Sequence, residues 1–341
     1  MSRTYPGGLI TKTPVVPSGP YVCGTAPGIW TIDQMLTWQK AGLWPSATGG
    51  QAPGTFAIFA LGAIGGPPST TKNKYTYSGD VNALATSSTV AGYYQSAAGN
   101  STRGIFALAY NVCSIATATR NKHTYSGCVV SSATSASTGN WQGSATGNST
   151  RGIFALGLNA GSVPLTTRDI YTYSSDTNGA AAAASVASYS GAATGNSTVG
   201  IFSIGTIVCC CGSTGVTTRN KYTYSGCTSG SATSSVASGV GNGTATGSST
   251  VGIFAIGANT TTREKYTYSG DVNASATASS VNSDYASAAG NSTVGIFAIG
   301  QNLTTRDKYT YSGDINASAT ASSASSRVGA ASSNGTTGVN I

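Results

Sequence analysis

Short apolar runs bounded by glycine recur along this chain, and each is followed by a segment in which polar and aromatic residues alternate. The run GIFALG and its variants are typical of a strand buried on both faces. In TTRDKYTYSGD, Arg306, Lys308 and Thr310 fall on one face and Asp307 and Tyr309 on the other, which predicts a strand with a polar and an aromatic face. The small-residue segment ASATASSV, followed by SAAGN or SATGN, predicts two further strands and a turn.

This pattern occurs six times. The phenylalanines of the apolar runs are 43–52 residues apart, and the first aromatic residues of the YTY segments are 43–51 residues apart. The two sets of anchors are Phe59, Phe106, Phe154, Phe202, Phe254 and Phe297, and Tyr75, His123, Tyr171, Tyr222, Tyr266 and Tyr309. Three to four strands in a repeat of this length are typical of one propeller blade. We therefore predict an all-β fold, a six-bladed β-propeller built from 43–52-residue repeats.

A β-solenoid, in which successive coils stack directly, is the competing architecture. Stacking would place equivalent cations of successive copies about 4.8 Å apart, and directly opposed like charges destabilise a sheet. A propeller separates these cations by a whole blade and is therefore favoured. The C-terminal GAASSNGTTGVNI is similar to GAATGNSTVGI, which begins at Gly191, so we predict that the tail supplies the strand that closes the ring.

Composition and charge argue against several functional classes. No run approaches the roughly 20 apolar residues of a membrane span, and the N-terminus has no signal-peptide core, so neither membrane insertion nor Sec export is expected. The net charge is +8, but eleven of the 17 Lys and Arg residues recur at two positions of one repeated strand. Cations that bind nucleic acid usually cluster on one face beside aromatic residues, so no nucleic-acid partner is predicted.

The chain shows no arrangement of catalytic or cofactor-binding residues. No carboxylate pair stands outside the repeat, and no glycine-rich phosphate loop follows a strand into a helix. The single histidine, His123, occupies a tyrosine position of the repeat, so no Ser–His–Asp set is indicated. We predict that the protein is not an enzyme and has no cofactor and no metal site.

The cysteines replace a repeated aspartate. Four copies carry an acid after YSG or YSS, and the remaining two carry Cys128 and Cys227. Only those two copies also have cysteine in the loop after the apolar run, at Cys113 in one and at Cys209, Cys210 and Cys211 in the other. This joint appearance predicts disulfides within blades, Cys113 with Cys128 and Cys227 with one of the three loop cysteines. Free thiols or a metal site remain the alternatives.

Residues 1–50 differ from the repeat domain at 51–341 and predict an anchoring segment. TPVVPSGPY is proline-rich and predicts an extended arm. In APGIWTIDQMLTWQKAGLWP, Thr31 and Gln34 form a capping box and Gly42 ends one short helix. A helix this short is not stable alone. We expect it to dock on a partner through its apolar residues, with the candidates Trp30, Met35, Leu36, Trp38 and Trp44.

The same N-terminal residues carry a resemblance. SRTYPGGLITKTP followed by GIWTIDQMLTWQKAGLWP resembles N-terminal segments of tailed-phage structural proteins, particularly from phages of cyanobacteria and other aquatic bacteria. Repeats with GIFALG and TRNKYTYSGD are similar to repeats encoded in such genomes. KYTYS loosely resembles a kelch-type blade, although the paired glycines and late tryptophan are absent. The resemblance implies a virion component, oligomeric in the particle, whose N-terminal segment contacts other virion proteins.

The loops after GIFALG differ in every copy while the strands barely change. Binding functions commonly reside in such loops on a rigid scaffold, although simple sequence drift would give the same pattern. We therefore expect a structural or appendage protein of the virion, such as a tail fibre, appendage or decoration, that displays its propeller for binding to a host-surface glycan or protein. A cell-surface lectin-like or adhesive repeat protein is the alternative.

Overall fold

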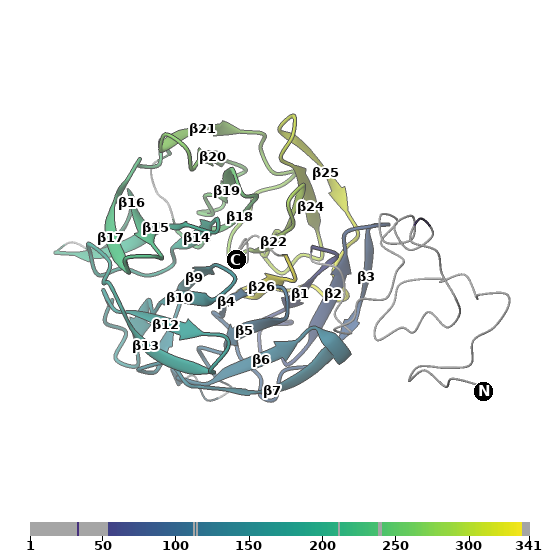
Figure 1. Ribbon diagram of the computed structural model, residues 1–341, viewed down its shortest axis with the longest axis horizontal. Helices are drawn as coiled ribbons and strands as arrows, with labels where there is room; N and C mark the ends of the chain where they lie inside the picture. Colours follow the sequence, from purple (N-terminus) through teal and green to yellow (C-terminus); the bar gives the residue numbers. More distant parts are fainter. Residues whose placement is uncertain are drawn as a thin grey trace, which may run out of the picture.

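The chain forms a six-bladed β-propeller (Figure 1). The computed structural model describes residues 54–111, 113, 115–210, 212–237 and 241–335, together with Asp33, which is helical. Within these residues, six four-stranded antiparallel sheets are arranged around a common axis. The predicted propeller is confirmed, and the stacked coils of a solenoid are excluded.

Each blade consists of an inner, a second, a third and an outer strand, counted from the axis outward. We number the blades from the one that contains β1. The inner strands of blades 1 to 6 are β26 (Ala330–Ser333), β4 (Ser96–Gly99), β9 (Ser144–Gly147), β14 (Ala192–Gly195), β18 (Thr244–Gly247) and β22 (Ser287–Gly290). The second strands are β1 (Phe56–Ala60), β5 (Arg103–Ala107), β10 (Arg151–Ala155), β15 (Val199–Cys209), β19 (Val251–Ala255) and β23 (Val294–Ala298).

The third strands carry the YTY segments. They are β2 (Lys72–Thr76), β6 (Arg120–Thr124), β12 (Arg168–Thr172), β16 (Gly212–Thr223), β20 (Arg263–Thr267) and β24 (Arg306–Thr310). The outer strands are β3 (Val81–Ala85), β7 (Val129–Ala133), β13 (Thr177–Ala181), β17 (Thr228–Ala232), β21 (Val272–Ala276) and β25 (Ile315–Ala319). A 3-10 turn, η1 (Ser126–Cys128), and a two-stranded ribbon of β8 (Asn140–Trp141) and β11 (Leu158–Asn159) complete the described elements.

Blades and sequence repeats are offset by one strand. The last strand of each repeat pairs with the apolar strand of the next repeat, as β4 does with β5. In blade 1 the inner strand comes from the C-terminal tail, where β26 pairs antiparallel with β1 and places Ala60 opposite Ala330. The predicted closing strand is therefore confirmed, and it leaves no unpaired inner edge in blade 1.

The two faces of each third strand pack against different blades, as the alternating pattern predicts. In β24, Arg306 points to blade 1, where its guanidinium lies 4.6 Å from the centre of the Phe59 ring. Asp307, one residue later, accepts a hydrogen bond of 2.8 Å from Arg263 of blade 5. Both β24 residues are buried. The cations that repeat along the chain therefore hold neighbouring blades together.

The same stacking occurs at all six blade junctions. A buried Arg, or Lys72 in blade 1, lies over the phenylalanine of the next blade at 4.3–4.6 Å. Three of these junctions also contain a buried ion pair, namely Arg120–Asp169 at 3.0 Å, Arg219–Glu264 at 2.6 Å and Arg263–Asp307 at 2.8 Å. Arg168 and Arg306 instead donate hydrogen bonds to the side-chain amides of Asn220 and Asn73 in the following blade.

Lys72 is the least satisfied of these cations. Its ammonium is buried, has no hydrogen-bond partner and lies 4.5 Å from the centre of the Phe106 ring. Burial disfavours the charged form and lowers the pKa of Lys72 from 10.5 to about 8. Burying the charged Lys72 side chain therefore lowers the stability of the folded state at neutral pH.

We expect Lys72→Met to stabilise the propeller at pH 7. The depressed pKa means that the unfolded chain binds more protons than the folded chain between about pH 8 and 10.5, so the wild-type unfolding free energy should rise by about 3 kcal/mol across this window. Urea unfolding at several pH values should show this rise in the wild type relative to the variant, in which it is missing. Subtracting the unfolding free energy of the variant from that of the wild type at each pH removes the contribution of tyrosine ionisation, which the two proteins share. A variant that is less stable at pH 7 and keeps the same pH dependence would contradict the assignment.

The repeated aspartates join neighbouring blades at the turn after the third strand. Asp176 accepts hydrogen bonds from the Tyr171 hydroxyl, from the Thr134 amide at 2.9 Å and from Lys122 Nζ at 2.7 Å. Partial burial opposes ionisation, but these hydrogen bonds outweigh it and hold the pKa of Asp176 below its usual value. Asp80, Asp271 and Asp314 accept equivalent tyrosine and threonine hydrogen bonds.

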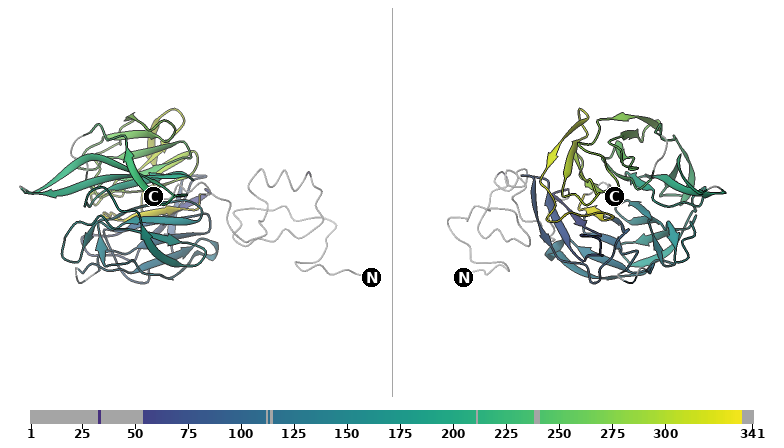
Figure 2. Two further views of the ribbon diagram at one scale, coloured as in Figure 1. Left: turned by 60° about the vertical axis from the view of Figure 1, so that its left-hand side comes forward. Right: turned by 180° about the vertical axis from the view of Figure 1, so that it is seen from behind.

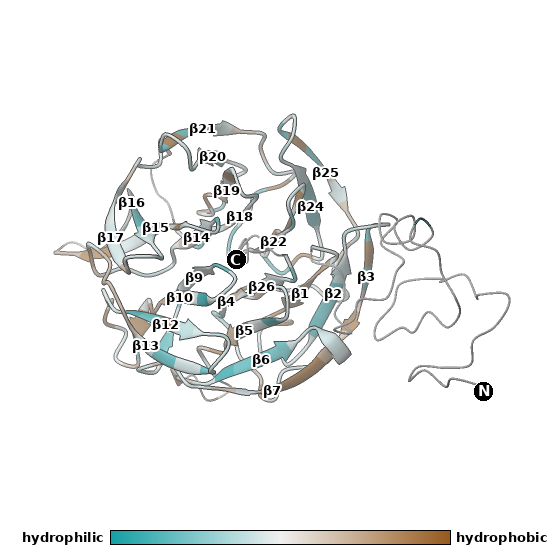
Figure 3. Ribbon diagram, viewed as in Figure 1, coloured by the Kyte–Doolittle hydropathy of each residue, from teal (hydrophilic) through white to brown (hydrophobic). Residues whose placement is uncertain are grey.

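The outer strands are short, and in five of them the first, third and fourth residues are exposed. Their first residue is a large aliphatic in four blades, Val81, Val129, Val272 and Ile315, each more than half exposed. Leu84 of β3 is 72% exposed, and these residues colour parts of the rim brown (Figure 3). The five-residue length of these strands limits edge-to-edge pairing with other chains.

Candidate binding site

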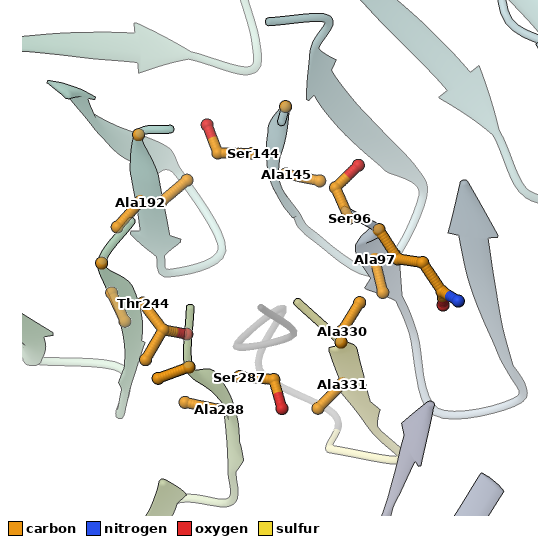
Figure 4. A pocket seen from close by; sticks show the side chains of 18 residues that line it. Ser96, Ala97, Ser144, Ala145, Ala192, Thr244, Ser287, Ala288, Ala330 and Ala331 are labelled. Atoms are coloured by element: carbon orange, nitrogen blue, oxygen red, sulfur yellow. The ribbon is translucent and has the colours of Figure 1, made fainter. Parts of the chain in front are cut away.

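Small side chains of the inner strands surround a narrow cavity on the propeller axis (Figure 4). Its volume is about 60 Å³, enough for a few water molecules but not for a sugar or nucleotide. The blades approach closely here. A Cβ on Gly252 would lie 2.4 Å from Thr194 Cγ2 of the neighbouring blade. The richness in Gly, Ala, Ser and Thr thus reflects close packing, and the axis itself is not the binding site.

The propeller is a disc with two faces (Figure 2). The turns after the inner strands and after the third strands lie on one face, the turn face. The loops between second and third strands and the connections between blades lie on the opposite face, the variable-loop face. Both ends of the described propeller lie on the turn face, where the Gly54 amide donates to the Asn334 carbonyl at 2.9 Å.

The turn face repeats the same inner turn in four of the six blades. In the GNST turns, Asn100 Oδ1 accepts hydrogen bonds from the amides of Thr102 and Arg103, and its Nδ2 donates to the Ser149 carbonyl of the next blade. Asn148 and Asn196 make the same bonds in their blades. These asparagines therefore serve as turn and junction residues, as the Gly-Asn pair suggests.

On the variable-loop face, a ring of backbone groups surrounds the opening of the axis, which we call the mouth. One residue per blade has a left-handed conformation with φ between 53° and 55°: Tyr94, Gln142, Ser190, Asn242, Tyr285 and Val328. Their amides link successive blades, for example Tyr285 to the Asn242 carbonyl at 3.0 Å and Val328 to the Tyr285 carbonyl at 2.9 Å. Because backbone bonds hold these strained positions, their side chains are free to differ.

Aromatic side chains gather at this mouth. The mouth cluster comprises Tyr93, Tyr94, Tyr110, Trp141 and Tyr285, all half-buried. The Tyr94 ring lies 5.2 Å from Trp141 and 5.8 Å from Tyr285, measured between ring centres, so it reaches from blade 2 toward both blade 3 and blade 6. Tyr110 of the β5–β6 loop lies 5.0 Å from Trp141. Burial, followed by its proximity to Tyr285, raises the pKa of Tyr94 to about 12, so its hydroxyl stays protonated at neutral pH.

Two charged residues join the aromatic ones. Asp284 and Arg327 occupy the position that Tyr93 and Trp141 occupy in other blades, one residue before the left-handed ring. Burial raises the pKa of Asp284, and its buried Oδ1 has no hydrogen-bond partner. Arg327 is exposed and acts electrostatically on the Tyr94 hydroxyl. Elsewhere in the described propeller, charged residues belong to second strands, third strands or the turns that follow third strands.

The mouth residues could have been found from the repeat. All described tyrosines outside the YTY segments, Tyr93, Tyr94, Tyr110, Tyr189 and Tyr285, lie on the variable-loop face, as does Trp141, the single tryptophan of the described propeller. Most of them stand just before the SAAG-type strand, where the six copies read GYYQ, NWQG, SYSG, VGNG, SDYA and SRVG. A position that varies chemically between invariant strands is the signal that the sequence analysis overlooked.

The predicted disulfides are not formed. The described cysteines Cys113, Cys128, Cys209, Cys210 and Cys227 are free thiols, and Cys211 lies outside the described residues. Cys113 lies on the variable-loop face and Cys128 follows β6 on the turn face. The five-residue strand β6 lies between the two cysteines and is about 17 Å long. A disulfide permits only about 4.4–6.8 Å between the two Cα atoms.

The second predicted pair fails for the same reason. Cys209 and Cys210 lie at the tip of the long β15–β16 hairpin, which projects from the disc (Figure 1). Cys227 lies beyond the other end of β16 on the turn face. It occupies the aspartate position as a thiol, and Arg151 donates to its sulfur at 3.1 Å.

The predicted docking residues Trp30, Met35, Leu36, Trp38 and Trp44 lie outside the described residues, as does the predicted boundary at residue 50. Among residues that the structure describes, no His, Cys, Asp and Glu side chains group as metal ligands would. No helix in the described ranges is long and apolar enough to cross a membrane.

Comparison with known proteins supports the fold alone. No family model and no curated protein matches the chain. Among solved structures, the one titled "Structure of YjhT" superposes with a TM-score of 0.56 at 7% identity, covering 71% of this chain and 88% of that chain. TolB from Acinetobacter baumannii superposes with a TM-score of 0.53 at 11% identity, covering 88% of this chain and 71% of that chain. At sequence identities this low, the superpositions establish a shared fold and carry no argument about function.

Proposed function

We propose that this protein is a virion appendage protein that displays its propeller for attachment to a host surface. The observation that carries the proposal is the separation of the two faces. The most variable loops and the mouth cluster lie on one face, and both ends of the described propeller lie on the other. A module anchored at the face that carries its ends therefore presents the mouth outward.

The chemistry of the two faces supports the same assignment. On the turn face, the repeated Asn and Asp side chains are used in turns and blade junctions, as in Asn100 and Asp176. On the variable-loop face, half-buried Tyr and Trp rings remain accessible, and such rings are enriched where proteins bind partners. The phage-like N-terminal segment supports anchoring to other virion proteins, and the particle is the location that we propose.

We expect labelled full-length protein to adsorb to strains within a panel of cyanobacteria and other aquatic bacteria, with Tyr94→Ala and Trp141→Ala each lowering the bound fraction at least tenfold. The reason is that both changes remove a ring from the outward face while the backbone bonds of the mouth remain. Flow cytometry with fluorescent protein measures the adsorption. Leu84→Ser, on the exposed rim, is the matched control and should bind like the wild type. Equal adsorption by wild type and both mouth variants would contradict the proposal.

The proposal that the N-terminal segment anchors the protein is tested separately, by incorporation into particles. Deleting residues 1–45 should prevent incorporation into particles and leave the thermal unfolding of the propeller unchanged, because every strand of the six blades lies between Phe56 and Ser333. Incorporation is measured by immunoblotting of purified particles. Normal incorporation of the deleted chain would remove the N-terminal segment from the proposal.

A further inference from the structure

The mouth cluster has the composition of a small-ligand site. Such sites combine aromatic walls with a few fixed polar groups. Tyr94 and Tyr285 line a hollow of about 50 Å³ together with Gln142 and Asn242. Trp141 lies beside it, with its ring centre 5.2 Å from that of Tyr94. The hollow is too small for a whole folded partner and suits part of one six-membered ring.

The rings are tilted toward one another rather than stacked flat. The Tyr94 and Trp141 planes meet at 61°, and the Tyr110 and Trp141 planes at 41°. Because all three side chains are only half-buried, parts of their faces stay open to solvent. The negative face of an aromatic ring attracts the slightly positive C–H bonds that cover one side of a pyranose.

The polar groups are suited to hydroxyls. Gln142 and Asn242, which line the hollow, offer amide donors and acceptors, and Arg327, which is exposed, offers further donors. Asp284 carries the charge opposite to that of Arg327. A sugar hydroxyl donates and accepts at once, so neighbouring hydroxyls can satisfy both kinds of group. The two charges are opposite, so the mouth selects neither an anionic nor a cationic ligand.

Building on the proposed attachment function, we propose that the mouth cluster binds a neutral glycan, with one pyranose ring held against Trp141 and Tyr94. A nucleic acid is disfavoured. Bases would also stack on these rings, but phosphates require several free cations, and the repeated ones are committed to the blade junctions, leaving Arg327 at the mouth. A protein receptor would need roughly 800 Å² of this surface, well beyond the mouth.

The direct test is binding of the full-length protein to immobilised neutral polysaccharides that contain vicinal diols, namely dextran, yeast mannan and 1,4-linked galactan, and to a glycan array. We expect at least one neutral glycan to bind, with Trp141→Ala and Tyr94→Ala each raising Kd tenfold or more. Tyr94→Phe keeps the ring and should change Kd less than threefold. Leu84→Ser is the matched control on the rim, and circular dichroism confirms that each variant is folded. Failure of every neutral glycan to bind, or binding that ignores both alanine variants, would overturn the inference.

Treated cells separate this inference from the proposed function. Periodate oxidation of the host surface should abolish adsorption, and protease treatment should leave it intact. Adsorption that depends on the mouth, survives periodate and is lost after protease would overturn the glycan and leave the attachment function standing. Tighter binding to single-stranded oligodeoxythymidine than to any glycan, weakening with salt, would also overturn it. Mouth-dependent glycan binding without adsorption to any strain would support the glycan and count against host attachment.

Discussion

Deleting residues 329–341, which removes β26, should abolish cooperative folding of the ring. The deletion takes away the partner of β1 from Ala57 to Ala60 and leaves blade 1 with three strands. It also removes bonds to neighbouring elements. The Tyr125 hydroxyl of blade 2 lies 2.7 Å from Ser332 Oγ, and the Phe56 amide donates to Asn334 Oδ1 at 3.0 Å. Thermal unfolding followed by circular dichroism should lose its single sharp transition, and size-exclusion chromatography should show aggregation through the exposed β1 edge.

A shorter deletion provides the control. Removing residues 336–341 leaves β26 and its described partners in place, and we expect the wild-type transition to persist. Adding a peptide of residues 327–335 to the longer deletion should restore the transition in part, because the missing strand can pair in trans. A deleted chain that unfolds at the wild-type temperature without the peptide would show that closure contributes little.

Glu264→Ala should lower the unfolding free energy by about 3–5 kcal/mol, the usual cost of leaving a buried charge without its partner. The buried Glu264 carboxylate accepts hydrogen bonds from Arg219 at 2.6 Å, from the Ser235 hydroxyl at 2.9 Å and from the Ala237 amide at 2.8 Å. Its hydrogen bonds hold the pKa of Glu264 below its usual value despite burial, so the carboxylate is charged in the fold. Urea unfolding at pH 7 measures the loss.

The double variant Arg219→Met, Glu264→Leu tests the cause. Replacing both charges with apolar groups of similar size removes the unpaired cation, so most of the stability should return. Arg168, which already faces the amide Asn220 at 3.1 Å, provides a comparison at another junction, where Asn220→Ala should cost less than Glu264→Ala. A double variant as unstable as Glu264→Ala would place the loss in packing rather than in charge.

The architecture could be predicted from the sequence because the residue pattern of each repeat indicates which strand faces are buried. Gly-bounded apolar runs such as the one around Phe106 have to be buried on both faces, and the alternation around Tyr309 assigns one strand face to each neighbouring blade. The GAASS tail is similar to the GAATG segment that begins at Gly191, so its role as the inner strand of blade 1 followed. In each case a local sequence pattern predicts the surface against which the segment packs.

The functional surface could not be predicted in the same way. The mouth cluster comes from four separated segments, and its members meet only because left-handed backbone positions such as Tyr94 and Tyr285 turn toward a common axis. The disulfide prediction was wrong because co-occurrence within one repeat was treated as proximity. Cys113 and Cys128 belong to one blade, but a strand lies between them and places them on opposite faces.

The position of β1 between β26 and β2 has a mechanical consequence. A load directed from the turn-face end of β1 toward the opposite face is parallel to this strand, so the hydrogen bonds to β26 and to β2 resist it together, in shear. A load between Gly54 and Asn334, which lie side by side, would instead peel β26 from β1 one rung at a time. The disc is therefore strong when pulled from its anchor toward its ligand and weak when its two ends are pulled apart, which favours tethering through one end.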